Sequence, residues 1–113
     1  SHAFEDTERK ITEGKRLLGC IPTGEVPYIM CGDLNSPSGS YVVSELDKVL
    51  GNLGPDPDQN TWTTKPFDYN GFIEDKLNWR LDHIYGKNIT AVRSEILTTD
   101  VSDHLPLLIE VEI

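Results

Sequence analysis

The chain of 113 residues lacks the features that mark several large classes of protein. It has no stretch near the roughly 20 consecutive apolar residues that a membrane span requires, and no signal-peptide pattern. Its two cysteines are too few for a disulfide framework or a four-thiolate zinc site. The length predicts one small domain, and the absence of a long apolar stretch predicts that it has no transmembrane segment. From the low cysteine content we expect a reducing, intracellular setting.

Basic residues are also scarce, with 10 Lys and Arg against 19 Asp and Glu and a formal net charge of −9. Dedicated nucleic-acid-binding modules carry a basic patch, because neutralising phosphates supplies much of their affinity. The basic residues here are scattered, which disfavours a plain DNA-binding module. An enzyme is not excluded, since bound Mg²⁺ would offset clustered carboxylates and present positive charge to a phosphate.

The pattern of apolar residues predicts two helices, over residues 5–20 and 41–50. Gly14 weakens the first, whereas Ser40 is a good N-cap and Gly51 a good stop signal for the second. The predicted strands cover residues 28–32, 79–85, 89–97 and 105–113. Residues 61–64 have strand propensity, residues 51–60 form a loop, and residues 65–78 are expected to be irregular.

Two of these strands carry patterns that predict their surroundings. Residues 28–32 form a continuous apolar run typical of a buried strand, and we expect Cys31 within it to be a buried thiol. Residues 105–113 alternate between apolar side chains and charged ones such as Glu110 and Glu112, which predicts a sheet with one buried face.

The first motif with chemical content is Gly-Asp-Leu-Asn at residues 32–35, directly after an apolar strand. In an extended chain Asp33 and Asn35 would point to the same side. The carboxylate could orient a water nucleophile, and the carboxamide could donate a hydrogen bond to a phosphate oxygen. A simple turn is the alternative, because Asp and Asn beside Gly favour turns.

The second motif is Asp82, a carboxylate inside the predicted strand of residues 79–85. A carboxylate in such a place needs a partner. An imidazole from another strand would serve, and so would Arg80, which lies two residues away on the same side. Both pairings are open from the residues alone.

The third motif is Ser-Asp-His-Leu-Pro at residues 102–106, just before the last strand. Asp103 offers a hard oxygen ligand for Mg²⁺. His104 could act as a general base or hydrogen-bond a phosphoryl oxygen while Asp82 holds its second nitrogen. A surface turn is the alternative for an isolated Ser-Asp-His.

In this order the three motifs resemble the carboxy-terminal half of the endonuclease/exonuclease/phosphatase superfamily. The resemblance implies an α+β fold for residues 1–113: half of a four-layer α/β/β/α sandwich, with a mixed, mostly antiparallel sheet and helices on one face. It also implies hydrolysis of phosphoester bonds that depends on Mg²⁺ or Mn²⁺. Family members place an Asn and the principal metal-binding Glu in an earlier segment. We therefore expect the amino-terminal half to be missing, and the 113 residues alone to lack a complete site.

The same resemblance implies roles for individual residues. Asp33 is similar to the catalytic aspartate that positions the attacking water, and Asn35 to the phosphate-binding asparagine. Asp82 is similar to the aspartate that orients the catalytic histidine, which His104 matches. Asp103 matches a carboxylate at or near the metal.

Further residues carry the resemblance less specifically. His2 is similar to a histidine that contacts the scissile phosphate in pancreatic-deoxyribonuclease-like members. Ser1-His2 could also remain from a purification tag. We favour the interpretation that His2 is native. The segment that contains Trp62 and Asn70 resembles the Trp-bearing segment of tyrosyl-DNA phosphodiesterases and, more loosely, that of sphingomyelinases. From this resemblance we predict that Trp62 and Asn70 bind substrate. Trp62 could stack on a base or an aromatic leaving group, or pack against the loop of residues 51–60.

The substrate stays open at this stage. Trp-Arg-Leu-Asp at residues 79–82 resembles abasic-site endonucleases, so nucleic acid and a phospholipid head group are both candidate phosphoesters. Two other functions compete with the enzyme. A catalytically inactive binding or regulatory protein on the same fold need not keep all five motif residues, and a plain divalent-metal-binding domain would cluster its carboxylates in one loop.

Overall fold

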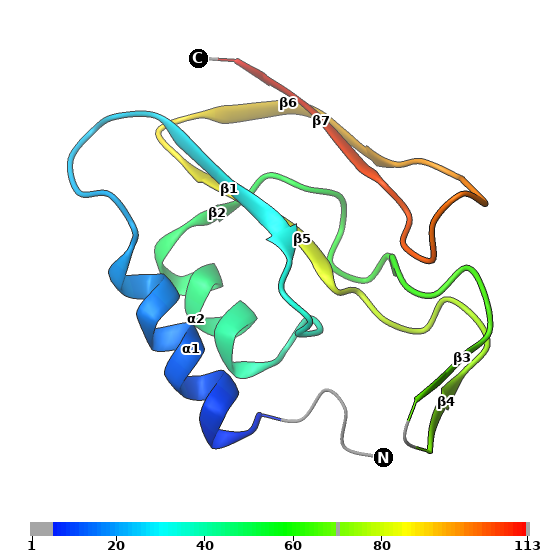
Figure 1. The fold of residues 1–113 in the computed structure, drawn as a ribbon. Helices are drawn as coiled ribbons and strands as arrows, with labels where there is room; N and C mark the ends of the chain where they lie inside the picture. Colours follow the sequence, from blue (N-terminus) through cyan, green and yellow to red (C-terminus); the bar gives the residue numbers. More distant parts are fainter. Residues whose placement is uncertain (1–5, 70, 113) are drawn as a thin grey trace.

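The computed structural model describes residues 6–69 and 71–112, and it confirms the predicted α+β class (Figure 1). In chain order the elements are α1 (Glu8–Gly19), β1 (Tyr28–Asp33), α2 (Tyr41–Val49), β2 (Gly51–Asn52), β3 (Phe67–Tyr69), β4 (Phe72–Glu74), β5 (Asp82–Lys87), β6 (Thr90–Ile96) and β7 (Leu107–Glu112). Neither helix has the length and apolar character of a membrane span in this described part.

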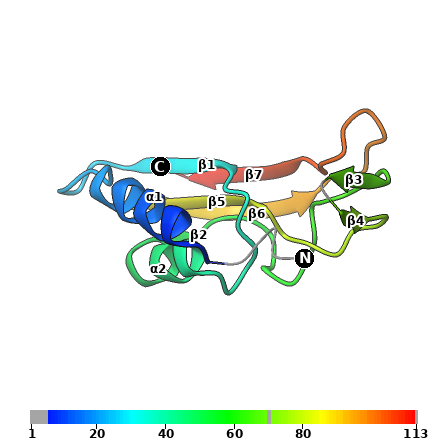
Figure 2. The same cartoon turned by 60° about the horizontal axis from the view of Figure 1, so that its bottom comes forward.

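The central sheet has three antiparallel strands in the order β1-β5-β2. Both helices lie on one side of β1 and β5, as Figures 1 and 2 show from two directions. In the register of β1 with β5, Asp33 pairs with Asp82 at the end of the ladder. Sheet register alone therefore places two predicted catalytic carboxylates side by side.

The hydrophobic core lies between the helices and this sheet. Its buried members are Val42, Val43, Leu46, Leu50 and Tyr85, and the half-buried residues around them include Leu17, Tyr28 and Met30. The N-terminus of α2 is capped by the Asp6 carboxylate, whose oxygens accept the Tyr41 N–H at 2.9 and 3.1 Å. The predicted N-cap, Ser40, occupies that position without a side-chain bond. Asp6 therefore ties the segment before α1 to α2.

The other side of β1 is open, which corrects the prediction of a buried strand. Tyr28 and Met30 are half-buried, whereas Ile29 and Cys31 on the opposite side are exposed. The reason is that the helices cover only one face, and within the described residues β1 pairs with β5 alone. The Cys31 thiol is therefore exposed rather than buried.

Strands β6 and β7 form a separate antiparallel pair that flanks the loop of residues 97–106. The predicted alternation is present in β7: Leu107, Ile109 and Val111 are half-buried, while the residues between them are exposed. The Leu97 N–H donates to the Pro106 carbonyl at 2.9 Å and closes the loop. This closed loop carries Asp103 and His104.

The prediction that residues 65–78 are irregular was wrong, because they contain the antiparallel hairpin β3–β4. Phe67 of β3 and Phe72 of β4 contact the Trp62 ring at centroid distances of 4.9 and 6.2 Å. Residues 61–64 form no strand of their own. Instead Trp62 makes isolated bridges with Trp79 and His104.

Candidate active site

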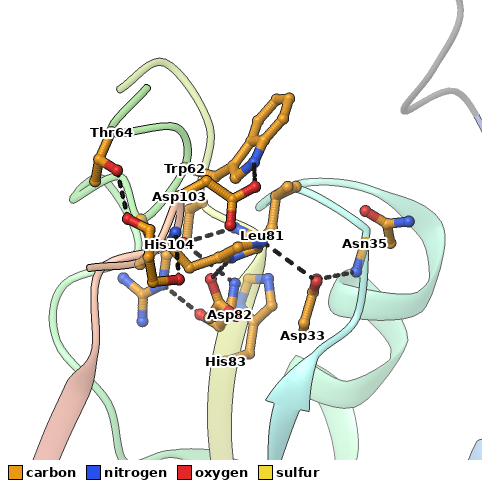
Figure 3. Close-up of polar contacts among 12 residues, drawn as sticks. Asp33, Asn35, Trp62, Thr64, Leu81, Asp82, His83, Asp103 and His104 are labelled. Carbon is orange, nitrogen blue, oxygen red and sulfur yellow. Dashed lines mark hydrogen bonds and ion pairs between the residues drawn. The ribbon is translucent and has the colours of Figure 1, made fainter. Parts of the chain in front are cut away.

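Three of the predicted site residues meet at the end of the β1–β5 ladder (Figure 3). The His104 imidazole lies between two carboxylates: Nδ1 is 2.7 Å from Asp82 Oδ2, and Nε2 is 3.6 Å from Asp33 Oδ2. Asp33 ends β1, Asp82 begins β5, and His104 comes from the loop before β7. The fold thus brings three segments far apart in the sequence to one point.

The surroundings of His104 favour its protonated form. Partial burial acts to lower the pKa of the imidazole, but the hydrogen bond to Asp82 and the charges of Asp82, Asp33 and Asp103 outweigh it, so the pKa lies above its ordinary value of 6.5. As an imidazolium, His104 donates Nδ1–H to Asp82. The 3.6 Å separation at Nε2 is too long for a good hydrogen bond to Asp33.

The alternative pairing of Asp82 with Arg80 is not the one that the side chains adopt. The Arg80 guanidinium is 2% exposed and donates to backbone carbonyls, including that of Asp82 at 2.7 Å through Nε. Its Nη atoms reach the carbonyls of Pro55, Asp56 and Gln59. Burial lowers the pKa of Arg80, although Tyr85, Asp82 and Asp56 nearby act to raise it. Arg80 therefore fixes the Asp82 backbone and leaves the carboxylate to His104.

The Gly-Asp-Leu-Asn motif forms a turn, and Asp33 within it lies beside His104, while the catalytic role of the motif stays a prediction. Asp33 Oδ1 accepts the Asn35 N–H at 2.8 Å, and Asn35 has a φ of 50°. The chain therefore does not stay extended, and the expectation that Asp33 and Asn35 project together from a strand was wrong. Figure 3 shows the Asn35 carboxamide beyond Asp33, on the side away from His104.

Asp103 is exposed beside His104, and its carboxylate is held by a residue with a different predicted role. The Trp62 indole Nε1–H donates to Asp103 Oδ2 at 3.2 Å. Trp62 is only 4% exposed and is enclosed by Phe67 and Phe72. The prediction that Trp62 stacks on a substrate ring is therefore corrected, because the ring faces are covered by the protein itself.

Sequence reasoning missed His83, the buried neighbour of Asp82. Its Nε2 lies 2.9 Å from the Ser36 carbonyl, which can only accept, so Nε2 carries the proton. Burial lowers the pKa of His83, mainly through desolvation, and keeps the ring neutral. On β5 it points to the opposite side from Asp82 and anchors the turn that carries Asn35. Its place in an alternating strand, next to Asp82, was the available signal.

Several donor atoms suit a hard divalent cation. Asp33, Asp82 and His104 each offer one, and these atoms lie within 4.8 Å of one another. Asp82 and His104 also contact each other directly, at 2.7 Å between Oδ2 and Nδ1. The exposed carboxylates of Asp33 and Asp103 are the oxygen donors that Mg²⁺ or Mn²⁺ prefers.

An open groove of about 550 Å³ borders the site on the side of Asp33 and Asn35. The wall formed by α1 includes Arg9, Lys10 and Glu13. Lys10 Nζ donates to the Asn35 carbonyl at 3.3 Å and joins α1 to the turn. Two other predicted site residues, His2 and Asn70, lie outside the described residues.

The chain matches the sequence model of the Endonuclease/Exonuclease/phosphatase family over residues 2–104. It therefore belongs to this family, whose members are hydrolases that act on phosphoesters, generally with a divalent metal. Comparison with individual curated proteins and with solved structures gave no match. The matched region contains Asp33, Asp82 and His104, the three residues that meet in the site.

The environment of His104 predicts a specific effect of Asp82→Asn. Without the carboxylate we expect the His104 pKa to fall, measured by NMR titration of the imidazole. Asp47→Asn, which removes a remote carboxylate charge beside Tyr85, should leave the His104 pKa unchanged. In the wild type the raised folded-state pKa makes the pair stabilising below pH 6.5, and this contribution is lost as pH rises through the folded pKa. An unchanged His104 titration in Asp82→Asn would contradict the assignment.

Proposed function

We propose that this protein hydrolyses phosphoester bonds, with the attack of water assisted by Asp33 and by the Asp82–His104 pair. The observation that carries the proposal is the position of His104, 2.7 Å from one carboxylate and 3.6 Å from another at the end of a sheet. Membership of a family of phosphoesterases supports the same chemistry. We further propose that segments of the family domain outside these residues complete the site.

Asp33 is the proposed base or orienting group for the attacking water. Its Oδ1 is fixed by the Asn35 N–H at 2.8 Å, which sets the direction of the carboxylate. The side chain is 44% exposed, so water can reach it. A carboxylate so placed accepts a hydrogen bond from water and can hold it for in-line attack on phosphorus.

His104 is the proposed donor to a phosphoryl oxygen. Asp82 holds Nδ1 and favours the imidazolium, so Nε2–H can donate where negative charge develops. The carboxamide of Asn35 and the imidazole of His2 are proposed as further phosphate contacts, and Asn70 as a substrate contact.

Mg²⁺ or Mn²⁺ is the proposed cofactor, with Asp103 as a ligand. When bound, such an ion would neutralise the phosphate and stabilise the charge that develops in the transition state. The carboxylate oxygens around His104 are donors of the right hardness.

Hydrolysis assays with Mg²⁺ and with EDTA test this proposal. The substrates are abasic-site DNA, a 5′-tyrosyl oligonucleotide, sphingomyelin and an aryl phosphodiester. Both the 113-residue chain and the protein expressed with any sequence that precedes Ser1 in its gene are assayed. We expect turnover by the longer protein that EDTA abolishes, and the preferred substrate would identify the subfamily. Turnover that survives EDTA would contradict the proposed role of the metal. No turnover on any substrate by a folded protein would contradict the proposed hydrolysis and leave a binding role.

A further inference from the structure

Residues 61–64 lie between the strand that carries Asp82 and the loop that carries His104, and they bond to both. The Thr61 hydroxyl accepts the N–H groups of Leu81 and Asp82 at 3.1 and 3.3 Å. On the other side, the Leu105 N–H donates to the Thr61 carbonyl at 2.8 Å, and the Thr64 N–H donates to the Asp103 carbonyl at 3.0 Å. This short segment therefore joins the two parts of the site, through the Thr61 hydroxyl on one side and through its backbone on the other.

Within this segment Trp62 bonds through its side chain to a carboxylate of the site. Its indole N–H donates to Asp103 Oδ2 at 3.2 Å. The ring is enclosed by Phe67 edge-on at 4.9 Å and by Phe72 stacked at 6.2 Å. A buried ring packed in this way has little rotamer freedom, so the direction of its N–H is fixed by the packing.

Asp103 needs such support because its own side chain is exposed on a loop. An unsupported carboxylate would exchange among rotamers, whereas a metal ligand must present its oxygen in one direction. Because the indole N–H binds Oδ2 of Asp103, the other carboxylate oxygen, Oδ1, is available to a cation or to the neighbouring imidazole. Figure 3 shows the Asp103 carboxylate between Trp62 and His104.

We propose that Trp62 is a positioning residue for the reaction: its indole N–H orients the Asp103 carboxylate for binding a divalent cation. The proposal rests on the function proposed above, in which Asp103 is a metal ligand. It replaces the role in substrate stacking, which the burial of the ring excludes.

The test compares Trp62→Phe with Phe67→Leu. Trp62→Phe removes the N–H and keeps an aromatic ring, whereas Phe67→Leu loosens the packing and keeps the N–H. Binding of Mn²⁺ alone, followed by electron paramagnetic resonance, is expected to weaken by about 10–100-fold in Trp62→Phe. Phe67→Leu should lose clearly less Mn²⁺ affinity than Trp62→Phe, because the N–H donor and the contact with Phe72 remain, while its melting temperature falls.

A second readout and a double variant separate positioning from general damage. Trp62→Phe should raise the Mg²⁺ concentration needed for half-maximal turnover without changing the KM for substrate. In an Asp103→Asn background, Trp62→Phe should have no further effect on Mn²⁺ affinity. Wild-type Mn²⁺ affinity in Trp62→Phe, or an equal loss in Phe67→Leu, would overturn the inference. A wild type that binds Mn²⁺ but turns over no substrate would overturn the proposed function alone, because the Mn²⁺ comparison still decides the role of Trp62. No Mn²⁺ binding by the wild type would overturn both.

Discussion

His104→Ala is expected to lower kcat/KM for phosphoester hydrolysis by about 10²–10⁴-fold. The variant removes the only group in the described site that contacts both Asp33 and Asp82. It also leaves the Asp82 carboxylate, 19% exposed, without its 2.7 Å partner. Because the proposed role of this donor is to act where charge develops, most of the effect should appear in kcat rather than in KM.

Steady-state kinetics with saturating Mg²⁺ measure this effect, and His83→Gln provides the contrast. His83 is buried and bonds to the Ser36 carbonyl on the other side of β5, so its loss should reduce the free energy of unfolding more than it reduces turnover by folded protein. Equal activity of His104→Ala and wild type would mean that the imidazole has no part in the chemistry.

Arg80→Met is expected to reduce the free energy of unfolding by about 2–4 kcal/mol. Methionine fills much of the same volume but leaves several backbone carbonyls without donors. The Asp82 carbonyl loses its 2.7 Å bond to Nε, and the loop of residues 55–59 loses its anchors. Asp56 and Gln59 are exposed, so their carbonyls can be rehydrated, whereas Pro55 is buried; the cost therefore stays below that of four orphaned groups.

Urea unfolding measures the change, with Arg16→Met as the matched control. Arg16 is exposed on α1, so its substitution should alter stability by less than about 0.5 kcal/mol. Arg80→Met should in addition weaken turnover, because the same guanidinium fixes the backbone of Asp82. A stability equal to that of Arg16→Met would show that the buried guanidinium is replaceable by apolar packing, as some buried ions are.

The three side chains that meet at the candidate site could be named from the sequence because their motifs resemble those of a known family. The physical reason for their meeting lies in the fold. The register of β1 with β5 pairs Asp33 with Asp82, and the loop before β7 delivers His104. The sequence gives no direct measure of register, so without the resemblance Arg80 was an equally good partner for Asp82.

What the sequence could not predict depends on tertiary packing. Burial of Trp62 follows from the hairpin β3–β4, which brings Phe67 and Phe72 against its ring. That hairpin was missed, although Asn-Gly at residues 70–71 between two aromatic runs is a strong local signal for one. Once the hairpin is recognised, an internal role for the tryptophan becomes more natural than an exposed one.

Exposure of Cys31 has a different cause. An apolar run of this kind is typical of a strand covered on both faces, and one face of β1 in the described residues is open. Burial depends on the layers that surround a strand, and a run of apolar residues contains no information on how many layers are present.

The dependence of metal-activated hydrolysis on pH decides whether the Asp82–His104 pair takes part in the chemistry. The measurement is kcat/KM for an aryl phosphodiester at saturating Mg²⁺, for wild type and Asp82→Asn. We predict that the wild-type rate falls as pH rises through the raised pKa of His104, and that this fall moves to lower pH in Asp82→Asn. The same profile in both proteins, or no hydrolysis that requires the metal, would contradict the account.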